Sequence, residues 1–220
     1  MNEDRLSRIG PLCGVLFTLL SFGGFAIGSA GGAPTLTLSD SSAKIVKGYA
    51  DPVGSAAWVG SYTTILALAA FALFAAWLHR SRRGEFSAAG LAAVAAYVGV
   101  ILVNVAVTCV LNYRAGHGMD AQQTLTLFYL QEFLYIASWG LAAAVLATAP
   151  VGGWLRRSAL VLAGLILVVM AVPKAGVAQF PPSLFYIWVL VAGIVSARGA
   201  YREDRRQVAG RAEPGRAGVA

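Results

Sequence analysis

The sequence contains few charged residues, and this shortage decides its class. Asp, Glu, Lys and Arg make up 12% of the 220 residues, about half of the roughly 25% that a soluble domain carries. Hydrophobic residues make up 58% of the chain, and they occur in long blocks rather than in alternating stripes. An ordinary water-soluble domain is therefore excluded, and an integral membrane protein is predicted.

Cysteine and histidine are equally scarce, with two of each. Cys13 and Cys109 are expected near opposite ends of their helices, too far apart for the Cα separation of about 7 Å that a disulfide allows. His79 and His117 are expected on opposite sides of the membrane. We predict no metal site and no cofactor, because neither histidine has other ligand residues at a suitable spacing. Phosphate-binding, nucleophile-elbow and zinc-protease motifs are also lacking.

Six apolar stretches are long enough, or nearly so, to cross a hydrocarbon core of roughly 30 Å. The fold class predicted is all-α, a polytopic bundle of six transmembrane helices within residues 1–197. The stretches are Ile9–Ala30, Ala57–His79, Ala88–Leu111, Thr124–Ala147, Ser158–Val172 and Pro182–Val195.

The net charge of +7 comes mainly from arginine clusters between these stretches. With both termini in the cytoplasm, thirteen Lys and Arg residues lie inside and four lie outside, as the positive-inside rule expects. We therefore predict a multi-pass protein of the cell (plasma) membrane whose partners are membrane lipids. No basic stripe is interleaved with aromatic residues, so nucleic-acid binding is not expected.

Two segments outside the helices need separate predictions. In the external loop 31–56, Asp40 or Ser41 could cap a short interfacial helix that carries Ile45 and Tyr49 on one side; an ordered loop without function is the alternative. The Arg-rich tail 198–220 is predicted to be a disordered cytoplasmic segment.

The first helix leaves two questions open. Its charged start, apolar run and small residues also fit a cleaved signal peptide, which would leave five helices. Its pairs Gly10/Gly14 and Gly24/Gly28 permit close helix packing. We expect packing inside the protein rather than a dimer seam, although oligomerisation stays possible.

Glu132 is the main candidate for function, because it lies inside the stretch Thr124–Ala147. An acidic side chain in a membrane costs roughly 3 kcal/mol or more, so it usually faces protein or water and often marks a functional site. Asn104 is expected at a similar depth on the neighbouring helix, within reach of Glu132. A purely structural pair that joins two helices would have the same residues.

Aromatic residues are expected at about the same membrane depth as Glu132. Phe128, Glu132, Tyr135 and Trp139 recur at spacings of three and four, so they share one helical face. The predicted site has Glu132 as candidate acid, with a set of polar and aromatic residues for the ligand. This set is Asn104, Gln131, Tyr129, Tyr135, Trp139, Tyr62 and Tyr186. The alternative is the ordinary enrichment of Tyr and Trp at membrane interfaces.

Two resemblances add to these predictions. Arg8-Ile9-Gly10-Pro11-Leu12, residues 42–51 and Leu78-His79-Arg80 resemble a group of uncharacterised six-helix membrane proteins of actinobacterial type. This resemblance covers roughly the first 85 residues and implies topology alone. A fainter similarity, resting on Glu132 among aromatic residues, is to small membrane-bound terpene cyclases. It implies proton transfer to an isoprenoid. A second carboxylate is not firmly matched, because Asp51 and Asp120 both lie in loops and either could reach the site.

These observations predict a membrane-embedded pocket for a lipophilic ligand such as a lipid or isoprenoid, with proton transfer as the reaction if the protein is an enzyme. Two alternatives remain. One is a non-enzymatic membrane subunit whose polar residues only join helices. The other is a small transporter with a water-accessible path past Glu132.

Overall fold

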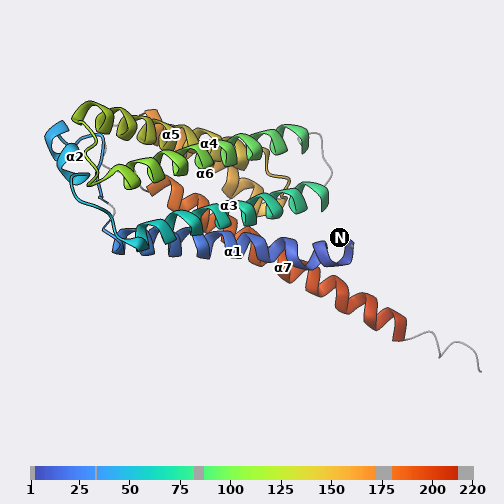
Figure 1. The fold of residues 1–220 in the computed structure, drawn as a ribbon. Helices are drawn as coiled ribbons and strands as arrows, with labels where there is room; N and C mark the ends of the chain where they lie inside the picture. Colours follow the sequence, from blue (N-terminus) through green and yellow to red (C-terminus); the bar gives the residue numbers. More distant parts are fainter. Residues whose placement is uncertain (1–2, 33, 82–86, 172–179, 213–220) are drawn as a thin grey trace, which may run out of the picture.

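Helices alone form the regular structure of the described residues, which are 3–32, 34–81, 87–171 and 180–212 of the computed structural model (Figure 1). This confirms the all-α fold class. The helices are α1 (Glu3–Ala30), α2 (Ser42–Gly48), α3 (Ser55–Ser81), α4 (Ser87–Arg114), α5 (Ala121–Thr148), α6 (Gly153–Ala171) and α7 (Phe180–Ala212).

Five helices are long and apolar enough to cross a membrane: α1, α3, α4, α5 and α6. They contain the first four predicted stretches and the fifth up to Ala171, since Val172 lies outside the described residues. The sixth stretch lies in α7, where the apolar part Ser183–Gly199 is shorter than the other spans. A membrane-embedded helical protein is therefore supported, whereas the sixth span stays a prediction.

The tail differs from its prediction over most of its length. We expected disorder from Arg198, but α7 continues to Ala212; residues 213–220 lie outside the described part. Residues 198–212 include five Arg and three Ala, and both residue types have high helix propensity. Extending an existing helix also avoids the cost of a new nucleus, so α7 continues after its apolar residues end.

The bundle has two groups of helices (Figure 1). α1 packs against α3 and α7, α5 packs against α4 and α6, and the pair α3–α4 joins the two groups. The short helix α2 lies at one end, where it packs against α5. We call this end the α2 end.

Glycines bring α1 and α3 close together along their length. A Cβ atom on Gly60 would lie 2.7 Å from the Gly24 carbonyl oxygen, and one on Gly10 would lie 2.1 Å from Cγ of Trp77. A Cβ on Gly14 would lie 3.0 Å from the Phe74 ring. We call Gly10, Gly14, Gly24 and Gly60 the glycine seam. These glycines pack inside the protein, as the sequence predicted.

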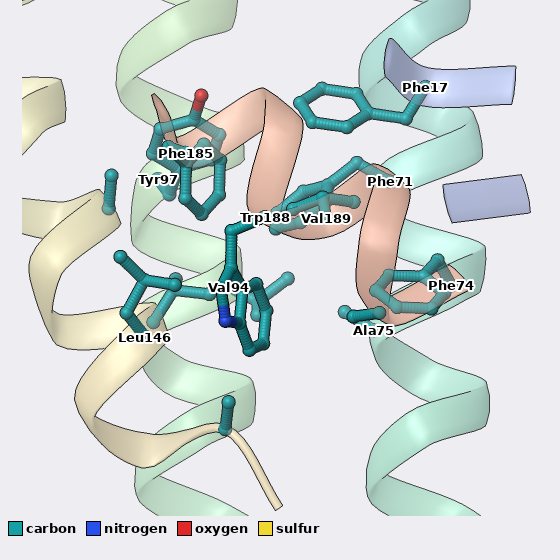
Figure 2. Close-up of a cluster of buried hydrophobic side chains, with 14 of the residues drawn as sticks. Phe17, Phe71, Phe74, Ala75, Val94, Tyr97, Leu146, Phe185, Trp188 and Val189 are labelled. Carbon is teal, nitrogen blue, oxygen red and sulfur yellow. The ribbon is translucent and has the colours of Figure 1, made fainter. Parts of the chain in front are cut away.

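Aromatic rings fill the centre of the bundle (Figure 2). The Phe17 and Phe71 ring centroids are 4.8 Å apart, those of Phe71 and Phe185 are 5.7 Å apart, and those of Tyr97 and Phe185 are 5.3 Å apart. These residues come from α1, α3, α4 and α7. Because lipid gives no hydrophobic driving force between helices, such close contacts must supply much of the cohesion.

Candidate functional site

Glu132 lies on α5 between two groups of buried side chains. Towards the α2 end, Phe128 belongs to a cluster with Ile45, Tyr49, Leu111 and Ala115, which we call the α2 cluster. In the other direction, Trp139 belongs to the central core, and Tyr135 packs against it. The face formed by Phe128, Glu132, Tyr135 and Trp139 therefore runs from one cluster to the other.

The Glu132 carboxyl is half-buried and forms no hydrogen bond or ion pair within the described part of the chain. It lies within electrostatic range of the Tyr49 and Tyr135 phenols. Roughly 12 Å of helix separates it from Thr124 at 1.5 Å per residue. An acidic side chain thus stands at membrane depth without a partner to offset the loss of hydration.

The α2 helix covers this region, and its sequence explains its position. The hydroxyl of Ser41 accepts a hydrogen bond from the Lys44 backbone N–H at 3.3 Å, so Ser41 is the N-cap. Asp40 instead pairs with the Lys44 ammonium and accepts a hydrogen bond from the Thr37 N–H, and these interactions lower the pKa of Asp40. The helix then places Ile45 and Tyr49 in the α2 cluster.

Tyr49, the C-cap residue of α2, lies within electrostatic range of Glu132. Its side chain is buried, with 7% exposed, and its carbonyl oxygen accepts a hydrogen bond from the Gly116 N–H at 3.3 Å. Burial, followed by the nearby Glu132 carboxylate, raises the pKa of Tyr49 to about 12. A neutral phenol is therefore held at the α2 end, within electrostatic range of Glu132.

Asn104 was expected near Glu132, but it contacts Gln131, the residue before it. Its side-chain Nδ2 donates a hydrogen bond to the backbone carbonyl of Gln131 at 2.6 Å, joining α4 to α5. The Gln131 side-chain Oε1 is buried and has no hydrogen-bond partner among the described residues. The polar residues predicted on these two helices do lie together, but Asn104 serves the backbone rather than the Glu132 carboxyl.

Tyr135, Trp139 and Tyr186 surround one cavity, together with Tyr97 and Ser138. The sequence pointed to the first three. Tyr97 and Ser138 were missed, although a tyrosine within the apolar run of α4 was a signal for one of them. The cavity is little larger than a water molecule, and so is a second one lined by His79 and Trp188.

The other predicted residues lie apart from this cavity. Tyr129 packs against the α2 cluster. The Tyr62 side chain is 63% exposed on α3, so the structure does not bring it to the cavity. The hydroxyls of Ser61, Thr63 and Thr64 bond to carbonyls of their own helix. They therefore offer little to a ligand.

Metal-ligand residues do not gather within the described residues: no group of three or more His, Cys, Asp or Glu side chains is close enough to hold an ion. Cys13 and Cys109 are both free thiols. His117 stacks on Tyr113 with ring centroids 5.8 Å apart, whereas His79 is buried at the other end of the bundle.

Comparisons with protein-family models, with curated proteins and with solved structures found no match to this chain. The site geometry and the membrane character of the helices are therefore the basis for any statement about function.

Proposed function

We propose that this protein binds a lipophilic molecule, a lipid or an isoprenoid, on α5 near the α2 end, with Glu132 as the hydrogen-bonding anchor. One observation carries the proposal: the Glu132 carboxyl lies within a span and has no partner in the described part of the protein. An acid at this depth costs roughly 3 kcal/mol or more. A ligand with a hydroxyl or amine head would offset part of that cost.

The neighbouring groups suit an amphipathic ligand. Gln131 offers a buried side-chain oxygen that lacks a partner among the described residues, and the Tyr49 phenol lies within electrostatic range of the acid. Exposed apolar side chains flank the acid on α5, with Leu130 44% exposed and Phe133 66% exposed. A polar head could therefore reach Glu132 while its hydrocarbon chain stays in the bilayer.

The size of the cavities favours binding at the lipid-facing surface. Both cavities described above are close to one water molecule in volume. A terpene-cyclase-like reaction would need a space that encloses a folded prenyl chain and excludes water. We therefore propose binding, with proton transfer from Glu132 to the bound head group as the only chemistry that this acid suggests.

The alternative of a structural membrane subunit also has an observation in its favour. Asn104 joins α4 to α5 through the Gln131 carbonyl, which is the role that this alternative assigns to polar residues in a membrane. Glu132 has no such bond in the described residues, and this difference is why we propose a ligand site there. A transporter would need a water-filled path, which the water-sized cavities do not provide.

We infer the finer topology from charge. The apolar segment Ser183–Gly199 of α7 would form the sixth span, with both termini on the cytoplasmic side of the cell (plasma) membrane. Thirteen of the seventeen Lys and Arg residues would then lie inside, in agreement with the positive-inside rule. Cysteine substitutions at Gly118 and Ala220, in a protein whose own Cys13 and Cys109 are replaced, test this. Only the first should react with a membrane-impermeant thiol reagent in intact cells, whereas reaction at position 220 would contradict the sixth span.

The test of function uses photoactivatable probes: a diazirine analogue of farnesol and a diazirine fatty alcohol, each added to membranes that contain the protein. Peptide mapping should place the cross-links on α5 around Glu132. A hydrogen bond to a charged group contributes roughly 1.5–3 kcal/mol, so Glu132→Gln should lower labelling about tenfold or more. Asp51→Asn, which removes an exposed loop carboxylate, is the matched control and should label like wild type.

Equal labelling of wild type and Glu132→Gln at the same peptide would contradict the anchor role. Labelling spread evenly over all lipid-facing helices would contradict the site itself. If only one of the two probes cross-links at Glu132, the result identifies the hydrocarbon part of the ligand as isoprenoid-like or as a straight chain.

A further inference from the structure

Several polar side chains border the cavity at the junction of α4, α5, α6 and α7. Tyr97, Tyr135, Ser138, Trp139 and Tyr186 all border it. Trp139 lies roughly 20 Å along α5 from Thr124 at 1.5 Å per residue, well away from the helix ends. Each of these polar groups must find its partner inside the protein, because the surrounding hydrocarbon offers none.

One of the polar groups is satisfied directly, because the Ser138 hydroxyl donates to the Tyr135 carbonyl at 2.6 Å. The phenols of Tyr97 and Tyr186 lie close to each other. The hydroxyl oxygens still have lone pairs free, because a hydroxyl oxygen can accept two hydrogen bonds.

The indole N–H of Trp139, by contrast, has no hydrogen-bond partner among the described residues. The Trp139 side chain is 6% exposed, and its indole Nε1 lies beside the Tyr135 hydroxyl. Trp188 provides the contrast, since its Nε1 donates to the Ser158 hydroxyl at 3.2 Å. A buried donor without a partner costs about 1–3 kcal/mol.

The cavity has the size and chemistry to remove this cost. A buried water needs a space of about one probe sphere and two to four polar partners, and the cavity has that size. The Trp139 N–H would donate to the water, and the water's two protons would go to hydroxyl oxygens of the tyrosines. An apolar cavity of the same size would stay dry, but this one is not apolar.

We propose that this cavity is a binding site for a single water molecule, which accepts a hydrogen bond from Trp139 and donates to the tyrosine hydroxyls. The water joins α5 to α4 and α7. Because α5 and α7 have little direct contact, a bridge there would fix the position of α7 in the bundle. This site is separate from the ligand site at Glu132 and does not depend on it.

Solid-state NMR of the full-length protein in liposomes tests the proposal. With ¹⁵N-labelled tryptophan, magnetisation transfer from water to each indole N–H can be measured, and Trp139→Phe assigns the Trp139 signal. We expect a strong water cross-peak at the Trp139 indole. Its absence in folded wild-type protein, in which the Trp188 indole gives a sharp signal, would overturn the proposal.

A pair of buried alanines provides matched variants. Ala142 lines the proposed water site and Ala75 lines the second cavity, and each side chain is 4% exposed. Ala142→Val should fill the site and reduce the Trp139 cross-peak at least fivefold, whereas Ala75→Val should leave it unchanged. A cross-peak that persists in folded Ala142→Val would place the water elsewhere and contradict the assignment.

Tyr135→Phe separates water from the neighbouring phenol as the source of the signal. The cross-peak should survive this substitution if a water molecule supplies the protons. Loss of the cross-peak in a folded Tyr135→Phe protein would mean that the exchangeable phenol proton had produced it, and the water site would be rejected.

Discussion

The glycine seam and the inward face of α5 are built from opposite kinds of residue. In the seam, α1 and α3 approach so closely that a single Cβ on Gly60 would collide with the Gly24 carbonyl. On α5, by contrast, Glu132, Gln131 and Trp139 each have a polar group without a partner among the described residues. Both regions lie within helices that are long and apolar enough to cross a membrane.

This difference separates structural residues from candidate functional ones. Small residues that let backbones approach closely are the usual means of joining helices in lipid, and the seam serves that purpose. Polar groups without partners add nothing to helix association and cost free energy in an apolar medium. The ligand that we propose at Glu132 and the water that we propose at Trp139 would offset this cost.

The largest expected effect comes from breaking the seam. In Gly60→Leu the new side chain would meet backbone atoms of Gly24 and Gly28 within 3 Å, so stability should fall by about 3 kcal/mol, the upper part of the usual range for overpacking. Gly99→Leu is the control, because a Cβ on Gly99 meets nothing within 4 Å. The fraction of monodisperse protein after detergent extraction, and its melting temperature, measure the effect.

If Gly60→Leu were as stable as Gly99→Leu, the two helices would not pack as described, and the contrast between the seam and α5 would fail. If both variants were destabilised equally, Gly99 would lie in a contact between protein molecules rather than in lipid.

A smaller loss of stability should appear at α2 as pH rises. The pKa of Tyr49 is raised from the ordinary 10 to about 12 in the folded protein, so the neutral phenol is favoured there. Its contribution to the docking of α2 is therefore complete below pH 10 and is lost as pH rises from about 10 through about 12. By linkage, a shift of this size corresponds to roughly 2–3 kcal/mol.

The absorbance at 295 nm, measured as the difference between wild type and Tyr49→Phe, reports the ionisation of this phenol. We expect a midpoint near pH 12. A midpoint near pH 10 would show that Tyr49 is exposed, and that α2 does not cover the region beside Glu132.

The smallest effect is expected from the bond between α4 and α5. Asn104→Leu removes the hydrogen bond to the Gln131 carbonyl, and such bonds average about 0.6 kcal/mol in membrane proteins. Thr108→Val is the control, because the Thr108 hydroxyl bonds to the Asn104 carbonyl within α4 itself. Unfolding by steric trapping in bicelles can resolve the difference in stability between the two variants. A larger loss of stability in Thr108→Val than in Asn104→Leu would contradict the role of the Asn104 bond between α4 and α5.

Features encoded by local chemistry could be predicted from the sequence. The apolar stretches correspond to helices, and Ser41, one of the two residues proposed as a cap, caps α2. The spacing of Phe128, Glu132, Tyr135 and Trp139 also placed these residues on one face, because helical periodicity depends only on sequence separation.

Contacts between helices were harder to predict. Lipid and protein are both apolar, so the residues of a span do not show which face meets protein and which meets lipid. This is why the exposure of Tyr62 was not anticipated, and why Asn104 was paired with Glu132 rather than with the adjacent Gln131 carbonyl. The depth of Asn104 in the membrane does not determine which of two adjacent residues it contacts. That choice depends on how the helix is rotated about its axis.

The most direct test of the ligand site is native mass spectrometry of the protein released from its own membranes. Wild type should retain a lipophilic species of defined mass, and Glu132→Gln should lose most of it while Asp51→Asn keeps it. If wild type and Glu132→Gln carry the same species in the same amount, or neither carries any, Glu132 does not anchor a ligand and its role is confined to the structure of the bundle.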